Sequence, residues 1–542
     1  MSTVVNFAGK NIVEPGVYSQ VKANVNVNPV PFSTGNVLII DTGEGAGYGG
    51  GSGITGSLAS GINSIYSFNT LGDFRNFVRG GLLWDLAEYL FIPANGAAGA
   101  PQVSLVRAAT TTPGSISFPF TSGAAGGTFG FKCKNEGVAG NGTAVSSVVT
   151  VGYGALMKVG IQNPAKWFIE FYEGTFKGVD GDGDPYDGQT AATCKQNIIA
   201  KSPEFDNINT LITWAKTDPG FNARFKMDVS TVVGTGALVA GDYTANTALK
   251  LATGGTTTYA STDTDMVYSK IGELDYTFML SLKSGDNAQG SDNTKALYHI
   301  TQEAEFKKFL IIGGGDDSTK FDQTNGSIPT AQYFDSAYAH VCHSGIQIQV
   351  PWSPILKNKS SLYHAAAYCG RLAGLQPQTS GTFKGLRFTK WLHTLTKTQR
   401  EVALQAGVVH NRFVPGLGYV TNQAINTLQK NTQMINPDGT SPETSIMRIA
   451  EQMNKELVLN MRPIFVGQNL NTSSPADVKA FIEGYLIKKT ATKTQDNYII
   501  TFSNVSVRQV QDYYECSYNF VPNSPLNKIF ITGFMLDANL SA

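Results

Sequence analysis

The sequence predicts a multidomain α/β protein, with a mainly parallel α/β sheet domain, an inserted β-rich domain, and a C-terminal α+β domain with extended terminal strand arms. Three observations predict this fold class. Strand and helix patterns alternate in two separated stretches, a Gly- and Thr-rich stretch with strand patterns lies between them, and two amphipathic helices followed by strands come last. The length of 542 residues suits about three or four domains.

Residues 1–34 are predicted to form an extended N-terminal arm. Pro15, Pro29 and Pro31 exclude a helix, and valines alternate with asparagines from Val25 to Val27. The segment has too few apolar residues to fold alone, so we expect it to lie on another surface.

The α/β sheet domain is predicted to comprise residues 35–111 and 263–375. Its first part contains strand patterns at 37–40 and 103–106, with apolar residues at helical spacing between Phe74 and Leu90. Strand–helix alternation of this kind is typical of a parallel sheet, and we expect both parts to share one sheet. The second part is expected to have strands at 276–282, 309–312 and 346–350, and helices at 293–306, 330–343 and 361–372.

The remaining residues divide into an insertion and a C-terminal domain. Residues 112–262 are predicted to form one or two inserted β-rich modules, because short strand patterns there alternate with Gly, Thr and Ser. Residues 376–528 are predicted to form the C-terminal α+β domain, followed by a strand arm at 529–542. Residues 440–443 and 474–477 have the pattern of capping boxes, each followed by an amphipathic helix. Strands are expected at 498–502, 505–510, 514–520 and 529–536.

Charge and composition limit the classes of function. Lys and Arg total 41, as do Asp and Glu, so the formal net charge is zero, and only 15% of residues are charged. A neutral chain has no global attraction to nucleic acid or to an anionic membrane, and we expect no binding to either. The start lacks a signal-peptide pattern, and the apolar run at 82–92 is interrupted by Asp85 and Glu88. We therefore expect a soluble product made in the cytoplasm.

The zero net charge conceals two segments of opposite sign. The segment from Leu356 to Met434 has ten Lys or Arg and one acid, whereas Asp263 to Asp335 has twelve acids and six Lys. Nucleic-acid binding is one explanation of the basic segment, but few aromatic residues interleave with its charges. We favour complementary faces that meet in neighbouring copies.

Patterns typical of enzymes and metal sites are present but incomplete. The glycine loop at 313–317 lacks the Lys-Ser/Thr of a phosphate-binding loop. The aspartates at 180, 182 and 184 resemble the start of a calcium loop, but Pro185 and Ala191 stand where Gly and Glu are required. A solvated loop is the preferred interpretation, with calcium as the alternative.

Histidines and cysteines give no complete catalytic set. His340 and His343 are three residues apart on a predicted helix, without a third ligand at metal-site spacing. A nucleophile at Cys342 or Cys369 would need partners that the sequence does not place. The five cysteines form no CxxC motif, which favours buried thiols in a reducing compartment. We expect no catalytic residue, metal ligand or cofactor.

Four motifs in order resemble the contractile tail sheath family of bacteriophages and related injection machines. They are EPGVY at 14–18, VLIIDTGEGAG at 37–47, the stretch LLWDLAEYLFIPANGAAGAPQVSLVR at 82–107, and the block from IMRIAEQMNKEL to IFITGFML at 446–536. The motifs cover the beginning and the last third of the chain, but not the insertion. The chain departs from the family pattern in an extended Gly/Ser loop at 43–61 and in the polar stretch at 418–428.

The resemblance implies a structural tail sheath subunit and no enzyme. Such a subunit polymerises as stacked hexameric rings around an inner tail tube, in a virion tail, and contracts to drive the tube through the host cell envelope. The implied partners are other copies, the inner tail tube protein, and baseplate and tail terminator proteins. The insertion is then an outer domain and the C-terminal domain an inner one. The alternatives are a virion-associated carbohydrate-active or proteolytic α/β enzyme, or a β-rich receptor-binding tail protein.

Two sets of residues are candidates for assembly contacts. An arm that cannot fold alone and a strand near the C-terminus are suited to pairing with a sheet of a neighbouring copy. Lysines of the second C-terminal helix are candidates to face the inner tube, with an ordinary solvated helix face as the alternative. The tube-facing candidates are Lys479, Lys488 and Lys489. The strand-exchange candidates are Val4, Val5, Val17, Tyr18, Ile529, Phe530, Ile531, Phe534 and Leu536.

Overall fold

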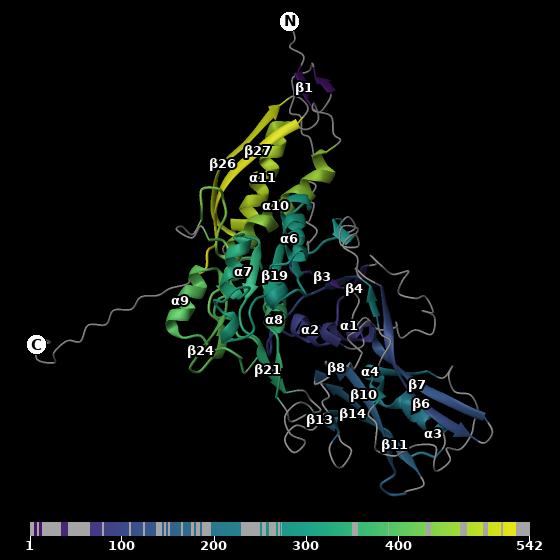
Figure 1. The fold of residues 1–542 in the computed structure, drawn as a ribbon. Helices are drawn as coiled ribbons and strands as arrows, with labels where there is room; N and C mark the ends of the chain where they lie inside the picture. The colour runs from purple at the N-terminus through teal and green to yellow at the C-terminus, as the bar shows by residue number, and fades with distance from the viewer. Residues whose placement is uncertain are drawn as a thin grey trace, which may run out of the picture.

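The computed structural model describes residues 5–12, 34–41, 65–107, 110–228, 250–258, 267–349, 356–429, 435–466, 474–490 and 497–526, with short gaps inside several of these ranges. A central sheet with its helices lies between a β-rich insertion at one end and the C-terminal helices and hairpin at the other (Figure 1). The expected mixed α/β class, with a parallel sheet, is confirmed.

The central sheet has seven strands in the order β23-β20-β19-β18-β3-β5-β4. Val37 pairs with Phe278 in parallel register, so the stretches before and after the insertion do share one sheet. Only the edge strand β4 is antiparallel to its neighbour. The strands are β3 (Val37–Asp41), β4 (Ile65–Phe68), β5 (Val103–Arg107), β18 (Phe278–Leu280), β19 (Phe309–Gly313), β20 (Ala339–Cys342) and β23 (Val408–Val409).

Both faces of this sheet are covered, which explains its continuous apolar strands. In β19, Phe309 and Ile311 belong to one buried cluster, and Leu310 and Ile312 belong to the other. The first cluster includes residues of α1 (Leu71–Phe77), α2 (Gly81–Phe91) and α8 (Ser361–Ala373). The second includes residues of α6 (Ser291–Tyr298), α7 (Ser327–Phe334) and α9 (Lys397–Gln405).

The helix predicted at 330–343 is present only as far as Phe334, and the rest of the prediction is wrong. The helix α7 ends at Phe334, because Asp335 adopts a left-handed conformation with φ 35°. Strand β20 follows, and all four of its residues are buried. A fully buried strand has no period-2 pattern, so its apolar run was mistaken for a helix face. His340 therefore lies in a strand.

Two further predicted elements differ in detail. The helical stretch between Phe74 and Leu90 is two helices, α1 and α2. The strand predicted at 346–350 exists as β21 (Ile346–Gln349), but it pairs antiparallel with β22 (Leu356–Lys359), outside the central sheet.

The insertion contains two four-stranded sheets and two helices, α3 (Ile208–Thr217) and α4 (Pro219–Arg224). Four buried phenylalanines, at 131, 171, 221 and 225, pack together mostly edge to face, with the centroids of contacting rings 4.9–5.7 Å apart. This aromatic cluster joins the two sheets and both helices in one core. The strands are β6 (Thr110–Ser122), β7 (Ala125–Glu136), β15 (Phe225–Asp228) and β17 (Thr256–Thr258) in one sheet, and β10 (Gly152–Val159), β11 (Trp167–Gly174), β14 (Asn197–Lys201) and β16 (Lys250–Leu251) in the other.

The C-terminal part consists of α10 (Thr444–Phe465), α11 (Pro475–Thr490) and a hairpin of β26 (Ile499–Val510) and β27 (Tyr513–Pro522). The capping box before α11 is confirmed, because Ser474 Oγ accepts from Asp477 N at 3.3 Å and the Asp477 carboxylate accepts from Ser474 N at 3.1 Å. The box predicted at 440–443 is wrong: α10 begins at Thr444, and the Glu443 carboxylate accepts from Ser380 and Ser445 instead. The strands predicted at 498–502 and 505–510 are one strand with a register shift.

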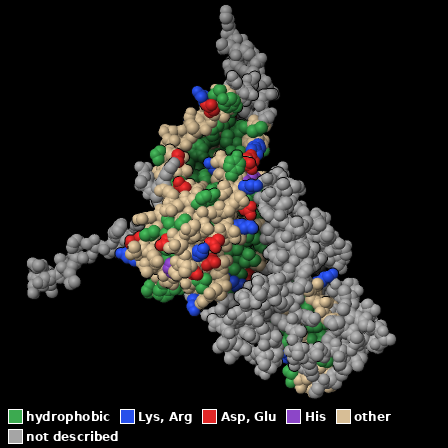
Figure 2. Space-filling view, viewed as in Figure 1, with side chains coloured by type: hydrophobic (Ala, Val, Ile, Leu, Met, Phe, Trp, Pro, Cys, Tyr) green, Lys and Arg blue, Asp and Glu red, His purple; other side chains and the backbone are tan. Residues whose placement is uncertain are grey.

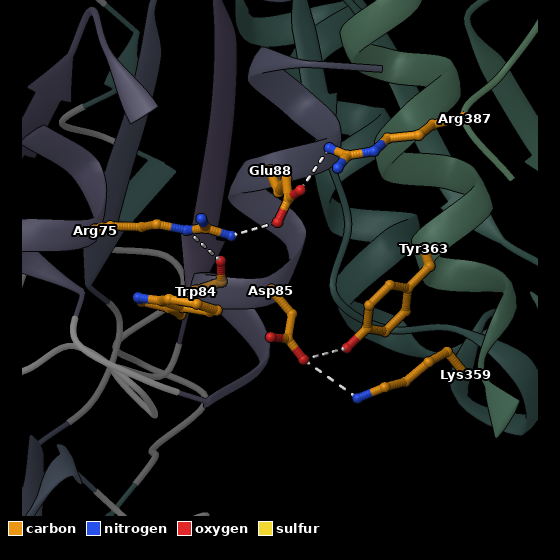
Figure 3. Close-up of polar contacts among 7 residues, drawn as sticks. All are labelled: Arg75, Trp84, Asp85, Glu88, Lys359, Tyr363 and Arg387. Carbon is orange, nitrogen blue, oxygen red and sulfur yellow. Dashed lines mark hydrogen bonds and ion pairs between the residues drawn. The ribbon is translucent and has the colours of Figure 1, made fainter. Parts of the chain in front are cut away.

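Charged side chains of α2 bind residues that follow the insertion in the sequence (Figure 3). Glu88 accepts from Arg75 at 2.7 Å and from Arg387 at 2.5 Å. Asp85 accepts from Lys359 at 3.2 Å and from the Tyr363 hydroxyl at 2.9 Å. These half-buried contacts fix α2 beside α8. Within the described residues, no helix has the length and apolar character to cross a membrane.

We expect Gly370→Ala to destabilise the protein, because α2 and α8 approach each other closely at this residue. A Cβ at Gly370 would lie 2.4 Å from Leu90 O, which is backbone and cannot rotate away. Overpacking of this kind costs about 1–3 kcal/mol. The matched control is Gly484→Ala in α11, where a Cβ would meet nothing within 4 Å, and Ala is favoured in a helix by about 1 kcal/mol. Thermal melting should show a lower midpoint only for Gly370→Ala; equal midpoints for both variants would contradict the close packing.

Candidate functional site

The C-terminal hairpin is the longest two-stranded sheet of the described structure. Strands β26 and β27 pair only with each other, with Phe502 opposite Phe520 and Val507 opposite Cys516. No other described strand pairs with the outer edge of either strand. Each edge therefore presents backbone N–H and C=O groups that a further strand could pair with.

One face of the hairpin is anchored on the two C-terminal helices. Phe502, Val507 and Phe520 pack against a core that contains Ile449 of α10 and Ile482 of α11. The other face is exposed: Ile500 keeps 63% of its surface accessible. The hairpin is thus held firmly by its inner face, while both edges stay open.

A buried glutamate holds the two helices and the hairpin together. Glu456 of α10 accepts from Tyr485 of α11 at 2.9 Å and from Gln452 at 2.8 Å, and it pairs with Lys489 at 2.7 Å. The ammonium of Lys489 also lies 4.2 Å from the ring centroid of Tyr498, next to the start of β26. Burial and the Glu456 carboxylate raise the pKa of Tyr485, so it stays a hydrogen-bond donor. A buried ion pair of this kind needs all its hydrogen bonds, which fixes the relative position of the elements.

This arrangement separates the three lysines expected to face a tube. Lys488 is exposed, and Lys479 is half exposed, 3.8 Å from Glu483. Lys489 is only 7% exposed, and its ammonium forms an ion pair with Glu456. The expectation for Lys489 is therefore corrected: its charge stabilises the subunit and is not presented at the surface.

Most of the strand-exchange candidates lie outside the described residues. Val5 belongs to the short strand β1 (Val5–Phe7), which pairs with β2 (Lys10–Ile12). The others, Val4, Val17, Tyr18 and the expected strand at 529–536, are not among the residues that the structure describes. The aspartates at 180, 182 and 184 are likewise outside it.

The junction between α10 and the central sheet domain combines polar and apolar contacts. Lys455 pairs with Asp275, Arg462 pairs with Glu305, and the Tyr338 hydroxyl donates to Glu451 at 2.6 Å.

The first turn of α10 is also buried in the sheet domain. Met447 belongs to a core of the sheet, whereas Met453 and Leu457 of the same helix belong to the C-terminal core. Apolar burial at Met447 and the polar contacts further along α10 therefore attach the helix together.

A serine and two histidines form a chain of hydrogen bonds that resembles a catalytic set. Ser327 Oγ lies 2.8 Å from His343 Nδ1, and His343 Nε2 lies 2.9 Å from His393 Nδ1. Ser327 is fully buried, and its Oγ also accepts from Gly315 N at 2.7 Å. A substrate cannot reach a buried hydroxyl that is already used in this way. We interpret the chain as structural.

The other buried histidines are held in the neutral form by their neighbours. His364 Nδ1 donates to His343 O at 2.8 Å, and its Nε2 accepts from Asn411 at 2.9 Å. His410 makes the same pair of contacts with Val408 O and Asn422. A second proton on either ring would place N–H against an amide N–H, so these histidines do not serve as acid–base groups near neutral pH.

The remaining candidates are also structural. Cys342 and Cys369 are buried, and burial raises the pKa of both thiols, which opposes nucleophilic chemistry. The polar groups of the loop after β19 are used in hydrogen bonds to the start of α8. The Asp316 carboxylate accepts from Ser361 N at 2.6 Å, and Gly314 O accepts from Ser361 Oγ at 2.6 Å. No cluster of three or more His, Cys, Asp or Glu suited to a metal ion occurs within the described residues. Cys516, unlike the thiols expected to be buried, is exposed.

We expect the stability of the protein to fall as the pH drops from 6.5 towards 4.5. Burial lowers the pKa of His340 and His410 to about 4 and that of His364 to about 3, below the ordinary value of 6.5. The unfolded chain therefore binds more protons than the folded chain in this range. For each such histidine, the free energy of unfolding falls by about 1.4 kcal/mol per pH unit as the pH drops. Above pH 6.5 the histidines are neutral in both states and no longer reduce the stability.

Urea denaturation at several pH values, with proton uptake measured on unfolding, checks this expectation. Uptake of two or more protons near pH 5 is expected, and His364→Asn should reduce it by about one. A free energy of unfolding that does not change between pH 4.5 and 6.5 would contradict the neutral, buried state of these rings.

Comparison with known proteins places the chain beside sheath proteins, although no protein-family model matches it. The tail sheath protein of Bacillus phage SP01 is 23% identical over 591 aligned positions, which cover 97% of this chain and 96% of that protein. This alignment runs through the insertion, which the sequence motifs did not reach.

Solved structures of sheath tail proteins are also similar to the chain. The protein from Desulfitobacterium hafniense has 14% identity and a TM-score of 0.50, with 93% of this chain and 100% of that chain covered. The protein from Listeria innocua has 13% identity and a TM-score of 0.44, with 91% and 96% covered. The similarity along nearly the whole sequence, together with the fold shared with the first of these structures, confirms the resemblance to the contractile tail sheath family that the sequence motifs indicated.

Proposed function

We propose that this chain is the structural subunit of a contractile tail sheath. It polymerises as stacked hexameric rings around an inner tail tube, in a virion tail, and contracts to drive the tube through the host cell envelope. The observation that carries the proposal is the alignment with a tail sheath protein over 97% of this chain. Baseplate and tail terminator proteins are the partners proposed for the two ends of the polymer.

The open hairpin supports a linkage of subunits by exchanged strands. It has two unpaired edges, and the chain has two candidate arms, at 1–34 and at 529–542. One neighbouring copy would supply a strand for the first edge and another copy a strand for the second edge. Backbone hydrogen bonds would then join the copies. Alternating apolar residues of the arms, among them Ile529, Ile531 and Val5, would supply the side chains for this pairing. Pairing would also remove the aggregation hazard of open edges.

Strand exchange gives a physical account of contraction. The linked strands act as tethers, while the sheet domain and the insertion move as rigid bodies into new contacts. The free energy is stored as the difference between two sets of contacts between copies, so the movement requires no nucleotide or other cofactor. The buried Glu456 cluster keeps the hairpin fixed on its helices during this movement, because Tyr485 and Lys489 hold it from α11.

The exposed lysines of α11 are proposed to face the inner tube. Lys479 and Lys488 are on one helix beside the hairpin, and Lys488 has no ion-pair partner in the described structure. A contact between exposed charges is weak and is screened by salt. Such a contact suits a sheath that must hold the tube before contraction and release it afterwards.

The enzyme alternative finds its strongest support in Ser327 and His343, and their burial argues against it. The similarity to sheath proteins supports a structural role for the chain. The receptor-binding alternative rests only on the Thr- and Gly-rich insertion, and no contact in the described structure favours it.

We expect the purified chain to form long hollow tubes of uniform diameter in negative-stain electron microscopy. Deletion of 529–542 should abolish the tubes and leave a soluble, folded monomer, because the proposed exchanged strand is lost. Deletion of only 540–542 is the control and should leave tubes intact. Normal tubes after the longer deletion would contradict strand exchange; a monodisperse wild-type monomer at every salt concentration would contradict the sheath proposal itself.

We expect Lys488→Glu to weaken co-assembly of the sheath with its inner tube protein. Reversal of an exposed charge replaces attraction by repulsion, at roughly 0.2–1 kcal/mol per contact, repeated in every subunit. Co-sedimentation of tubes at increasing salt measures the effect. Lys216→Glu, at an exposed position of the insertion helix α3, is the matched control and should behave as wild type. Identical salt dependence for both variants would show that Lys488 does not face the tube.

A further inference from the structure

A small pocket opens where α10 meets the central sheet domain, beside the residue from which the described sheet domain starts. Its lining includes Thr34, two lysines of the sheet domain (Lys307 and Lys308) and two cationic residues of α10 (Arg448 and Lys455). Glu451 is the acidic residue in the lining. The pocket is therefore shared by the C-terminal helix and the sheet domain, and its lining carries more positive than negative charge.

Lys308 is a buried residue of this lining, and its ammonium forms no direct ion pair within the described structure. The side chain is only 6% exposed, and within the described structure it forms no ion pair or hydrogen bond. The rings of Tyr276 and Phe306 lie near it, with centroids 5.3 and 5.7 Å from Nζ. Aromatic rings attract a cation but do not accept its three N–H groups in ordinary hydrogen bonds. In the part of the chain that the structure describes, no protein group therefore accepts from the Lys308 ammonium in a hydrogen bond.

The guanidinium of Arg448 also has N–H donors without a hydrogen-bond partner in the described structure. Arg448 is 2% exposed, and its Nη2 donates to Leu375 O at 2.7 Å. Its Nε and Nη1 have no hydrogen-bond partner in the described part of the chain. Buried donors that stay unpaired destabilise the folded state, and more so when they are charged. Unpaired donors of this kind in a pocket lining are hard to explain as packing alone.

The nearby acids are largely engaged elsewhere. Asp275 pairs with Lys455, and the Glu451 carboxylate accepts the Tyr338 hydroxyl at 2.6 Å. Lys307 is exposed, and its ammonium lies 5.1 Å from the Tyr338 ring centroid. Within the described residues, neither Lys308 nor Arg448 forms a direct ion pair with these acids, although the charges of Asp275 and Glu451 act on Lys308 from nearby.

We propose that this pocket binds a small oxyanion, such as a carboxylate or inorganic phosphate, through Lys308 and Arg448. The oxygens of the anion accept from the unpaired N–H groups of both residues, which come from the sheet domain and from α10. A bound anion thereby fastens the C-terminal helix to the sheet domain. The site does not depend on the proposed sheath function, because it lies within one chain.

Thermal melting of the unassembled full chain at pH 7 tests the site, with sodium acetate or sodium phosphate added against sodium chloride at equal ionic strength. The expected result is a saturable rise in melting temperature of a few degrees with at least one oxyanion. Lys308→Met should abolish this rise, and Lys307→Gln, at the exposed neighbour, should retain it. No saturable rise in the wild type, or an equal rise in Lys308→Met, would overturn the proposal.

The pH dependence of oxyanion binding gives a second test, which is measured in the wild type. Burial lowers the pKa of Lys308 to about 8, an effect that Lys455 increases and that Asp275, Glu451 and Glu305 oppose. Oxyanion binding in the wild type should therefore weaken between pH 7 and pH 9, as Lys308 loses its proton. Lys308→Arg, which stays charged, should bind equally well at both values; equal binding by the wild type at pH 7 and pH 9 would exclude Lys308 as a ligand.

Discussion

The parallel pairing of β3 with β18 is the contact on which the rest of the structure depends. Val37 lies opposite Phe278, with the whole insertion between them in sequence. Because β3 also pairs with β5, this single register joins both halves of the sheet and brings α2 against α8. The side chain of Asn36 reinforces the pairing by donating to Gln102 at 3.1 Å and to Asp275 O at 2.9 Å. The insertion can then vary without changing the sheet.

The two ends of this sheet carry different features. Ligand sites in parallel α/β sheets ordinarily lie at the carboxyl ends of the strands. Here that end is filled by neutral histidines, with His343 and His364 hydrogen-bonded to neighbouring segments. The amino end, where Thr277 N donates to Asn36 O, instead adjoins α10 and the cationic pocket. The distribution supports a protein in which the usual catalytic end of the sheet is filled by side chains and the opposite end adjoins α10. On the face shown in Figure 2, Lys and Arg side chains lie close to Asp and Glu side chains over the middle of the molecule.

The sequence predicts the regular elements better than the polar contacts between them. The strand at 309–312, the helix at 361–372 and the cap at Ser474 follow from apolar runs and capping chemistry, and all three are present. The strand β20 was missed because all its residues are buried, which removes the alternation that identifies strands. Lys489 was misplaced because its burial depends on Glu456, a residue of another helix. The sequence did contain a signal that Glu456 is buried, since it lies between Met453 and Leu457 in the apolar stripe of α10. A buried glutamate requires a cationic or hydrogen-bonding partner.

The helix α10 connects two cores, which has a consequence for any large movement of the subunit. The hairpin and helices have a core around Met453 and Ile482, while Met447 at the start of α10 belongs to a core of the sheet. Rearrangement at the junction would break contacts such as Lys455–Asp275 and Arg462–Glu305, whose groups regain water, and at Met447 it would also disturb the sheet core. Apolar cores resist continuous deformation, whereas partly exposed ion pairs exchange partners at low cost. The part of α10 after Met447, where ion pairs hold the helix to the sheet domain, is therefore easier to displace than Met447 itself.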